Sequence, residues 1–345
     1  MNTTVLAAPA AAAATSSIDL RGLRHVGLAH PLDEAAVQRL RTAFPALRFE
    51  PVPREGWQSA VAQADALLLG RQAVPVDALL EHALRLRWIH GVGAGVERLV
   101  TPRLRASGVV LTNSRGVHAV PIAEHVLALM LAFARQLPAL LQSQQAARWI
   151  DKPLRGTFEL QGQTLAVVGL GEIGGALARK AAALGLRVLA VRRRPQQGGG
   201  ALPPGVERVA GLDGLDAVLA EADHVAVCLP LTDATRGLFD AARLARLRAG
   251  AHLYNIGRGA LVDSAALLAA LESGRLGGAG LDVTDPEPLP SESPLWRHPR
   301  VVITAHTSAA SPRNGARMLD ILADNLGRAA RGEPLRNQVD LAQGY

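Results

Sequence analysis

The stretch TLAVVGLGEIGG, residues 164–175, joins a predicted strand to a predicted helix through a glycine-rich turn and decides the fold. Its glycines have the Gly-x-Gly-x-x-Gly spacing: Gly169 permits the tight turn, Gly171 lets a pyrophosphate approach, and Gly174 lets helix and strand pack closely. The helix that follows offers N–H groups and a positive dipole end to phosphates. An ordinary glycine-rich turn is the alternative, but the flanking strand and helix favour a nucleotide site. The predicted cofactor-binding residues of this turn are Gly169, Gly171, Glu172, Ile173 and Gly174.

The next predicted strand, RVLAV at residues 187–191, runs into three arginines, Arg192, Arg193 and Arg194. An NAD site usually places a carboxylate near this point, where it accepts a hydrogen bond from the ribose 2′-hydroxyl. A carboxylate would repel a 2′-phosphate, whereas a guanidinium group can bind one through two parallel hydrogen bonds. Arg192 and Arg193 therefore predict NADP, with NAD as the alternative cofactor. For at least one of the three arginines, a solvated loop of positive charge is the simpler interpretation.

On both sides of this turn, short apolar runs alternate with helical patterns, which predicts an α/β fold with parallel sheets and crossover helices. Residues 120–149 form a long helical pattern that is interrupted at Pro138 and is long enough to bridge two domains. The pattern at residues 316–332 predicts an amphipathic helix that could fold onto either domain. The expected strands lie at residues 24–30, 64–70, 86–91, 109–113, 164–170, 187–192, 224–230, 252–257, 278–283 and 301–306.

The composition indicates a globular protein, since 49% of the 345 residues are hydrophobic and 19% are charged. The net charge of +7 comes almost wholly from arginine, yet only 3% of residues are aromatic, so few side chains could stack on bases. We therefore predict small anionic ligands and no nucleic-acid partner. Cys228 is the single cysteine, which excludes an intrachain disulfide and indicates a reducing, cytoplasmic location.

Targeting and membrane signals are weak along the chain. No apolar stretch reaches the length of a membrane span without charges, so no membrane partner is predicted. The opening residues are rich in alanine but have no positively charged start, and we predict a disordered leader over residues 1–17 rather than an export signal. No metal site is predicted.

Three further strand ends carry a coherent set of chemical groups. Arg258 lies in a glycine turn, Asp282 and Glu287 lie at and beyond the end of another predicted strand, and His306 ends a third. In an open α/β sheet, ligands bind at the carboxyl ends of the strands. An arginine can hold a carboxylate, a histidine can move a proton near neutral pH, and a glutamate can orient that histidine. Each group also has a purely structural interpretation: Arg258 as a loop arginine, Glu287 as an ordinary loop acid and His306 as a strand-end histidine.

At these residues the sequence resembles the D-isomer-specific 2-hydroxyacid dehydrogenase family. The resemblance covers residues 21–340 and includes HGVGAGVE, NSRGVHAVPIAEHVLALML, LAVVGLGEIG, CLPLTDATRGLF, NIGRGALVD, GAGLDVTDPEPLP, TAHTSA and GEPLRNQVD. Several ordered motifs are far more specific than any one of them. The chain departs from the family where a proline usually precedes the histidine, because Ala305 stands there.

The resemblance implies a role for each group. Arg258 would bind the substrate carboxylate and polarise the 2-oxo group, and His306 would donate a proton to the carbonyl oxygen. Glu287 would hydrogen-bond His306 and favour its protonated form. Backbone N–H groups of Val92 and Gly93 would hold the other end of the carboxylate. The implied contacts to the cofactor, beyond the glycine turn and the arginines, are Leu229, Pro230, Thr235, Ile256, Gly257, Asp282 and His306.

The resemblance also implies two doubly wound parallel-sheet domains. A Rossmann cofactor domain at residues 120–306 would be inserted into a flavodoxin-like substrate domain at residues 18–119 and 307–345. A homodimer, paired through the bridging helix, and a cleft that closes over the substrate are further expectations.

Three functional hypotheses follow. The first is an NADP-linked reductase of small 2-oxo acids such as glyoxylate or hydroxypyruvate. The second is an NAD-linked dehydrogenase of another D-2-hydroxy acid, either phosphorylated or branched. The third is a dinucleotide-sensing corepressor that binds protein partners without turnover. The three residues Arg258, Glu287 and His306 argue for an enzyme.

Overall fold

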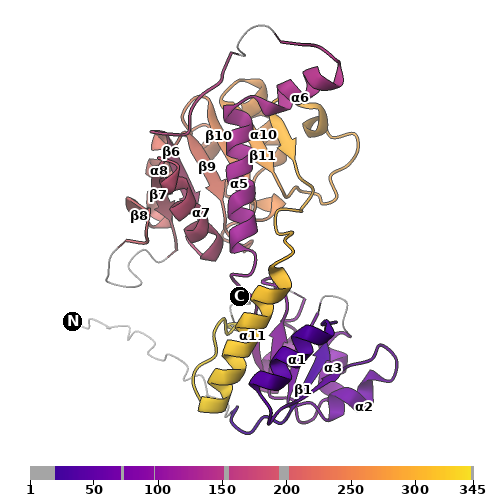
Figure 1. The fold of residues 1–345 in the computed structure, drawn as a ribbon. Helices are drawn as coiled ribbons and strands as arrows, with labels where there is room; N and C mark the ends of the chain where they lie inside the picture. Colours follow the sequence, from indigo (N-terminus) through magenta and orange to yellow (C-terminus); the bar gives the residue numbers. More distant parts are fainter. Residues whose placement is uncertain (1–19, 71–73, 97, 151–154, 194–201, 343–345) are drawn as a thin grey trace, which may run out of the picture. The chain divides into compact units, whose positions relative to one another are not determined.

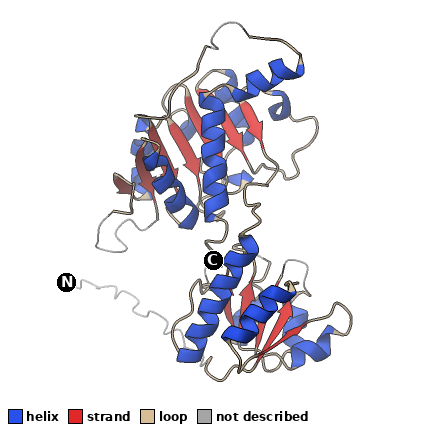
Figure 2. Cartoon of the chain, in the orientation of Figure 1, coloured by secondary structure: helices blue, strands red, loops and turns tan. Residues whose placement is uncertain are grey.

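The computed structural model describes residues 20–70, 74–96, 98–150, 155–193 and 202–342. The predicted leader at residues 1–17 and Arg194 lie outside these ranges. The chain divides into two compact units: one contains the described residues up to Val117 and those from Arg313 onward, and the other extends from His118 to Pro312. Within the described ranges the strands form one sheet of five and one of seven, every pair of neighbours being parallel (Figures 1 and 2). The predicted α/β class with two doubly wound sheets is confirmed.

In the first unit the strand order is β2-β1-β3-β4-β5, the flavodoxin-like order. The chain reverses its direction of winding between β1 and β3, which places a ligand-binding switch point at their carboxyl ends. The strands are β1 (His25–Ala29), β2 (Arg48–Pro51), β3 (Ala66–Leu69), β4 (Trp88–Gly91) and β5 (Val110–Asn113), and the helices are α1 (Glu34–Ala43), α2 (Trp57–Ala62), α3 (Val76–His82), α4 (Pro102–Ser107) and α11 (Asn314–Arg331).

In the second unit the order is β12-β11-β10-β9-β6-β7-β8, which is the Rossmann order with one strand added, and its switch point lies between β6 and β9. The strands are β6 (Thr164–Val168), β7 (Arg187–Val191), β8 (Arg208–Ala210), β9 (His224–Val227), β10 (Ala251–Asn255), β11 (Leu276–Leu281) and β12 (Val301–Ile303). The helices are α5 (Ala119–Ala134), α6 (Leu137–Gln145), α7 (Glu172–Ala183), α8 (Leu215–Glu221), α9 (Ala241–Leu244), α10 (Ser264–Glu272) and the short 3-10 turns η1 (Leu212–Gly214), η2 (Gly259–Leu261) and η3 (Pro294–Arg297).

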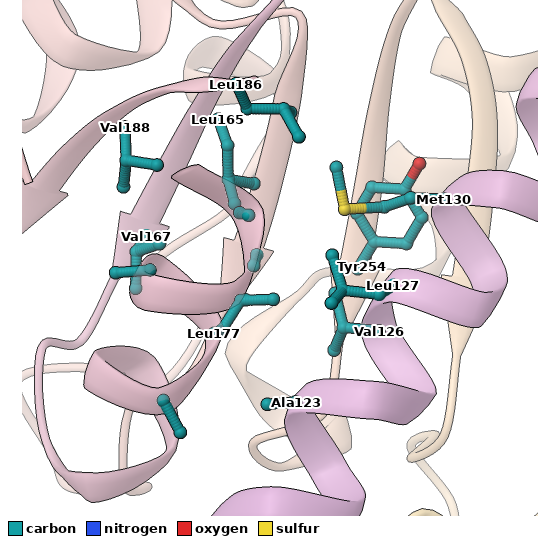
Figure 3. Close-up of a cluster of buried hydrophobic side chains, with 14 of the residues drawn as sticks. Ala123, Val126, Leu127, Met130, Leu165, Val167, Leu177, Leu186, Val188 and Tyr254 are labelled. Carbon is teal, nitrogen blue, oxygen red and sulfur yellow. The ribbon is translucent and has the colours of Figure 1, made fainter. Parts of the chain in front are cut away.

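The central strand β6 is buried on both faces, as its continuous apolar sequence predicts. Leu165 and Val167 pack with residues of α5 and α7 on one face, shown in Figure 3, while Ala166 and Val168 pack with α8 on the other. This alternation follows from the two-residue period of a strand. Truncating Leu165 to alanine would cost about 2–5 kcal/mol of folding free energy.

The predicted long helix breaks before Pro138 rather than at it. Gln136 adopts a left-handed conformation with φ of 55°, and α6 begins at the next residue with Pro138 in its first turn. Among the described residues, no single helix has the length and apolar composition of a membrane span; only α5 and α6 taken together do, and they are bent by 70° at this break.

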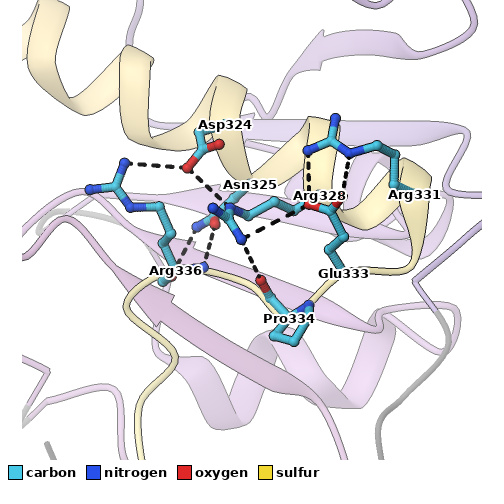
Figure 4. Close-up of polar contacts among 7 residues, drawn as sticks. All are labelled: Asp324, Asn325, Arg328, Arg331, Glu333, Pro334 and Arg336. Atoms are coloured by element: carbon cyan, nitrogen blue, oxygen red, sulfur yellow. Dashed lines mark hydrogen bonds and ion pairs between the residues drawn. The ribbon is translucent and has the colours of Figure 1, made fainter. Parts of the chain in front are cut away.

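The C-terminal helix α11 belongs to the first unit, a choice that the sequence left open. Its apolar face, including Met318, Leu322 and Leu326, packs with residues of β1 and α1. Past its end the chain turns back, and the buried side chain of Asn325 donates to the carbonyl of Arg336 (3.1 Å) and accepts from its N–H (2.7 Å) (Figure 4). The strands that the sequence analysis missed, β2 and β8, are the edge strands on one side of each sheet, where one-sided burial leaves no apolar run to detect.

Candidate active site

The glycine turn after β6 lies at the switch point of the seven-stranded sheet. Gly169 has a φ of 107°, and a Cβ there would lie 2.6 Å from the carbonyl oxygen of Cys228 at the end of β9. A Cβ on Gly174 would lie 2.2 Å from the carbonyl oxygen of Gly169, so the helix could not pack this closely with any other residue. At Gly171, by contrast, no atom of the described residues lies within 4 Å of the place that a Cβ would take, so the backbone is open to a ligand.

The same turn starts helix α7 with Gly171 as its N-cap. The first hydrogen bond of the helix runs from the N–H of Gly175 to the carbonyl of Gly171 (2.8 Å). The N–H groups of Glu172, Ile173 and Gly174 therefore belong to the first turn, which has no intrahelical acceptors. An open backbone at Gly171 beside these donors fits the pyrophosphate of a dinucleotide.

Arg192 follows the last residue of β7, where an NAD site would have its acid. Its backbone N–H donates to the carbonyl of Ala210 at the end of β8 (3.0 Å), which fixes the chain at this strand end. The Arg192 residue is half-buried and Arg193 is exposed. Arg192 and Arg193 thus lie at the carboxyl edge of the sheet that also carries the glycine turn.

The loop after β9 forms the other side of the switch point. Thr235 is 7% exposed, and its hydroxyl donates to the carbonyl of Pro230 (2.8 Å) and accepts from the N–H of Thr232 (2.8 Å). These bonds brace the segment that contains Leu229 and Pro230. Three of the predicted cofactor contacts, Leu229, Pro230 and Thr235, are therefore brought together beside the end of β9.

The buried side chain of Asn255 shapes the turn that carries Arg258. Asn255 donates to the carbonyl of Arg258 (3.0 Å) and accepts from the N–H of Gly257 (3.2 Å), so one amide holds both sides of the turn after β10. A Cβ on Gly257 would lie 2.7 Å from the carbonyl oxygen of Leu229, which places Ile256 and Gly257 against the end of β9. The half-buried Arg258 thus projects from a rigid turn.

The neighbouring residue Gly259 connects this turn to the loop after β11. A Cβ at Gly259 would lie 1.8 Å from the carbonyl oxygen of Thr284, so this position excludes any side chain. Arg258 is therefore held beside the segment that leads to Glu287, although the two residues are 29 positions apart in the chain.

His306 and Glu287 form a direct pair. The imidazole Nδ1 lies 2.5 Å from Glu287 Oε1, and both side chains are partly exposed, at 49% and 41%. A carboxylate oxygen can only accept, so Nδ1 carries the hydrogen of this bond and Nε2 remains for another partner. The pair has the geometry of a proton donor that is oriented and charge-compensated by an acid.

Asp282 anchors the loop that carries His306. Its carboxylate is 2% exposed and accepts from the Thr304 hydroxyl (2.7 Å) and from the N–H groups of Thr307 (2.9 Å) and Ser308 (3.1 Å), as well as from the Ser308 hydroxyl. Its backbone carbonyl also accepts from the His306 N–H (2.6 Å). These bonds surround two consecutive left-handed residues, Ala305 with φ of 48° and His306 with φ of 58°. Such strain persists only where the surroundings enforce it, and Asp282 supplies that enforcement.

A histidine of helix α5 extends this network. Thr304 gives its only hydroxyl hydrogen to Asp282, so it must accept from Nε2 of His125 across their 2.9 Å contact. His125 is thus a structural support of the His306 loop.

The remaining predicted substrate residues, Val92 and Gly93, lie in the first unit, in the turn after β4. The N–H of Val92 donates to the carbonyl of Leu69 (3.1 Å), so it is already engaged. The carbonyl of Gly93 accepts from the Ser114 N–H (3.0 Å). Of the two predicted N–H donors, the one of Val92 is therefore used within the fold, and the one of Gly93 is the candidate for a ligand contact.

Comparisons with known proteins agree with this geometry. Residues 127–308 match the model described as the NAD binding domain of D-isomer specific 2-hydroxyacid dehydrogenases. Glyoxylate/hydroxypyruvate reductase B of Salmonella newport is 36% identical over 303 residues, which are 87% of this chain and 91% of that protein. The chain belongs to the D-isomer specific 2-hydroxyacid dehydrogenase family.

The names of other similar proteins include two different substrates. D-3-phosphoglycerate dehydrogenase of Archaeoglobus fulgidus is 31% identical over 321 residues, 91% of this chain but 59% of that protein, so the chain spans little more than half the length of such relatives. The crystal structure of an NADPH-dependent glyoxylate/hydroxypyruvate reductase from Sinorhizobium meliloti, in complex with NADP and sulfate, has a TM-score of 0.75 and 29% identity and covers 93% of this chain and 100% of that one.

For this family member, sequence reasoning found the groups at the strand ends but missed their supports. Asn255, Thr304 and Ser308 were not singled out, and the anchoring role of Asp282 was not predicted. An asparagine at the end of a buried strand and a Thr-x-x-x-Ser run beyond the next strand were the available signals. Among the residues that the structure describes, no group of three or more His, Cys, Asp or Glu side chains could hold a metal ion.

Proposed function

We propose that the protein is an NADPH-preferring reductase that converts small 2-oxo acids, such as glyoxylate or hydroxypyruvate, to 2-hydroxy acids. The pairing of His306 with Glu287 at 2.5 Å, on a loop held by buried Asp282, is the observation that carries this proposal. The unit from His118 to Pro312 would bind the cofactor, and the other unit would bind the substrate. The name and bound NADP of the Sinorhizobium meliloti structure support the same assignment.

In this proposal each group has one task. The permanent positive charge of Arg258 attracts the substrate carboxylate and polarises the neighbouring carbonyl. His306 in its protonated form donates a hydrogen bond to Glu287 through Nδ1 and gives the proton on Nε2 to the carbonyl oxygen. When bound, the reduced nicotinamide supplies the hydride for the carbonyl carbon. Glu287 accepts the Nδ1 hydrogen and compensates the charge of the imidazolium, so it orients the proton donor.

The preference for NADPH rests on the end of β7. Arg192 occupies the position where a carboxylate would select against a 2′-phosphate. Arg192→Asp should therefore shift the ratio of kcat/KM values from NADPH toward NADH, because it removes a charge-assisted contact and adds a repulsive charge. A ratio that does not change would remove Arg192 from the cofactor site.

An NAD-linked dehydrogenase of a phosphorylated 2-hydroxy acid is the second candidate. The identity to D-3-phosphoglycerate dehydrogenases favours it. The two candidates differ in both substrate and cofactor, so one set of assays separates them.

We also propose a homodimer that pairs through the surface around α5 and α6. Four leucines there are 42–56% exposed, namely Leu131, Leu137, Leu141 and Leu184. Leu131 and Leu184 line a shallow hollow together with Arg135 and Glu159. A two-fold interface must be complementary to itself, and a surface with apolar side chains and both charges can meet that requirement. Size-exclusion chromatography with light scattering should give twice the mass of one chain for the unmodified protein. Leu141→Glu should reduce this mass to that of one chain. We also propose a cytoplasmic location, because Cys228 is the single cysteine and an intrachain disulfide is excluded.

The deciding experiment is a panel of purified protein with NADPH or NADH against glyoxylate, hydroxypyruvate, phosphohydroxypyruvate, pyruvate and 2-oxoisocaproate. Oxidation of NADPH with glyoxylate or hydroxypyruvate is expected, and His306→Gln should abolish most of kcat. Turnover confined to NADH and phosphohydroxypyruvate would favour the second candidate. No oxidation with any substrate would contradict the proposal that the chain is an enzyme.

A further inference from the structure

The turn after β4 is held by hydrogen bonds from the segment that follows β5. Ser114 donates from its hydroxyl to the carbonyl of Gly91 (3.0 Å) and from its N–H to the carbonyl of Gly93 (3.0 Å). The neighbouring Asn113 side chain donates to the carbonyl of Ala94 (2.7 Å). Three successive contacts therefore draw the carbonyls of this turn toward β5.

These contacts determine the orientation of one N–H group. In a trans peptide the carbonyl and the following N–H point in opposite directions. The Gly91–Val92 peptide is held on both sides, by Ser114 and by the carbonyl of Leu69, and the peptide after Gly93 is held by Ser114. Between these two immobilised planes lies the Val92–Gly93 peptide, whose N–H belongs to Gly93.

Ser114 is itself held by a directed chain of buried side chains. Its hydroxyl hydrogen goes to Gly91, so it must accept from Nε2 of His90 across their 3.1 Å contact. His90 Nδ1 is then the acceptor for the Thr112 hydroxyl (2.8 Å), and Thr112 accepts from Trp88 Nε1 (2.8 Å). The four side chains are at most 1% exposed, and each hydrogen bond has only one consistent direction.

This chain requires a neutral imidazole with its hydrogen on Nε2. A charged imidazolium would turn Nδ1 into a second donor facing Thr112, which would still have to accept from Trp88 and would have to release its own hydrogen elsewhere. Burial lowers the pKa of His90 to about 4, so the required form is present at neutral pH. Packing alone does not require a histidine here, because an apolar side chain of similar volume would fill the space without the cost of burying polar atoms.

The segment after β5 is also fixed by hydrogen bonds with Asn337. Asn337, itself left-handed with φ of 55°, donates from its side chain to the carbonyls of Asn113 (3.2 Å) and Arg115 (2.8 Å). Asn113 in turn donates its N–H to the carbonyl of Asn337 (3.2 Å). Ser114 therefore acts from a rigid support and not from a mobile loop.

We propose that His90 and Ser114 are positioning residues for the 2-oxo acid, because they preorganise the turn whose Gly93 N–H binds the substrate carboxylate. Preorganised donors bind an anion without the cost of ordering the backbone at the moment of binding. The inference rests on the proposed function and adds to it the residues that shape the carboxylate contact in the first unit. In this proposal the side chains of Trp88, His90, Thr112 and Ser114 act through the turn and not on the reacting atoms, so their replacement should change binding and not chemistry.

The test compares His90→Leu, His90→Gln and Ser114→Ala with the unmodified protein, with the best 2-oxo acid of the panel and NADPH. His90→Leu and Ser114→Ala should raise KM for the 2-oxo acid about tenfold, the equivalent of one lost hydrogen bond, and leave kcat within about threefold. His90→Gln keeps a donor that reaches Ser114 and should restore KM to within about threefold of the unmodified value. The Kd of NADPH should stay constant in all three variants.

The matched control is His25→Gln. His25 belongs to the same sheet but lies at the amino end of β1, where its Nε2 pairs with Glu50 (3.0 Å). Its replacement should leave KM unchanged whatever it does to the thermal midpoint of unfolding. Ser114→Ala keeps the inference testable if His90→Leu fails to fold.

Two kinds of failure are distinguishable. If the unmodified protein reduces 2-oxo acids but His90→Leu and Ser114→Ala keep its KM, the positioning role is wrong and the proposed function stands. The role is also wrong if His90→Gln is as impaired as His90→Leu, or if kcat falls while KM does not change. An unmodified protein that is inactive toward the whole panel overturns the proposed function and this inference with it.

Discussion

The left-handed conformation of Ala305 makes a sharp prediction about the loop that carries His306. Family resemblance leads one to expect a proline at this position, yet the φ of Ala305 is 48°. The proline ring restricts φ to about −65°, so Ala305→Pro would have to rotate the backbone by roughly 110°. Ala305→Gly is the matched control, because glycine adopts positive φ without a steric penalty.

The size of the effect follows from the contacts on either side of Ala305. The rotation would separate the Thr304 hydroxyl and the N–H of Thr307 from the Asp282 carboxylate, to which they now donate at 2.7 and 2.9 Å. Hydrogen bonds to a charged group contribute about 1.5–3 kcal/mol each, so the loss of both would cost about 3–6 kcal/mol. The loop should relax instead of keeping its conformation, and His306 should leave Glu287.

The assay is kcat for a 2-oxo acid with NADPH, together with the Kd of NADPH. We expect Ala305→Pro to lower kcat by about a hundredfold or more, which corresponds to roughly 3 kcal/mol of lost transition-state stabilisation. Ala305→Gly should retain kcat within about threefold, because the relief of the left-handed conformation, about 1–2 kcal/mol, offsets the greater backbone entropy of glycine in the unfolded chain. Full activity of the proline variant would refute the left-handed geometry. A glycine variant as impaired as the proline variant would show that φ is not the cause.

Three further predictions concern other parts of the second unit. Burial lowers the pKa of His252 from 6.5 to about 4, so the stability that the neutral imidazole contributes is present above pH 6.5 and is lost as the pH falls toward 4. Between pH 7.5 and 4.5 the free energy of unfolding of His252→Phe should fall by about 2–3 kcal/mol less than that of the unmodified protein. Hydrogen exchange in β9 and β10 measures both decreases, and equal decreases would contradict this prediction. Asp282→Asn keeps the shape but not the charge of the anchor, and should destabilise the protein by about 2–4 kcal/mol and lower kcat more than it changes the Kd of NADPH; an unchanged kcat would remove Asp282 from the support of the His306 loop. Gly171→Ala should weaken NADPH binding without lowering the thermal midpoint, since its surroundings are open, whereas Gly174→Ala should lower both; equal thermal shifts would argue against these separate roles.

Local patterns were sufficient to locate the glycine turn and the strand-end side chains on which the proposed site depends. The spacing of Gly169, Gly171 and Gly174 between a strand and a helix predicts the turn, because backbone sterics at those positions depend on neighbouring residues. Arg258 and His306 follow apolar runs that are long enough to indicate buried strands. Their common edge follows from the rule that parallel strands place their carboxyl ends together.

The supports of those groups could not be found in this way. Asp282 reaches Thr304 and Ser308 across 22 and 26 residues, and it does so because β11 and β12 pair in one particular register. The edge strands β2 and β8 were missed because a strand that is buried on one side has no continuous apolar pattern.

The fold class, the family and the chemical identity of the strand-end groups follow from short spacings and residue types, so the amino-acid order is enough to predict them. The side chains that hold those groups became known only from the folded structure. The N–H of Val92 is engaged by Leu69, Asp282 is an anchor, and His90 is joined to Ser114, because hydrogen-bond partners across strands are set by sheet order, register and loop conformation. A sequence pattern does not contain the sheet order, the register or the loop conformation.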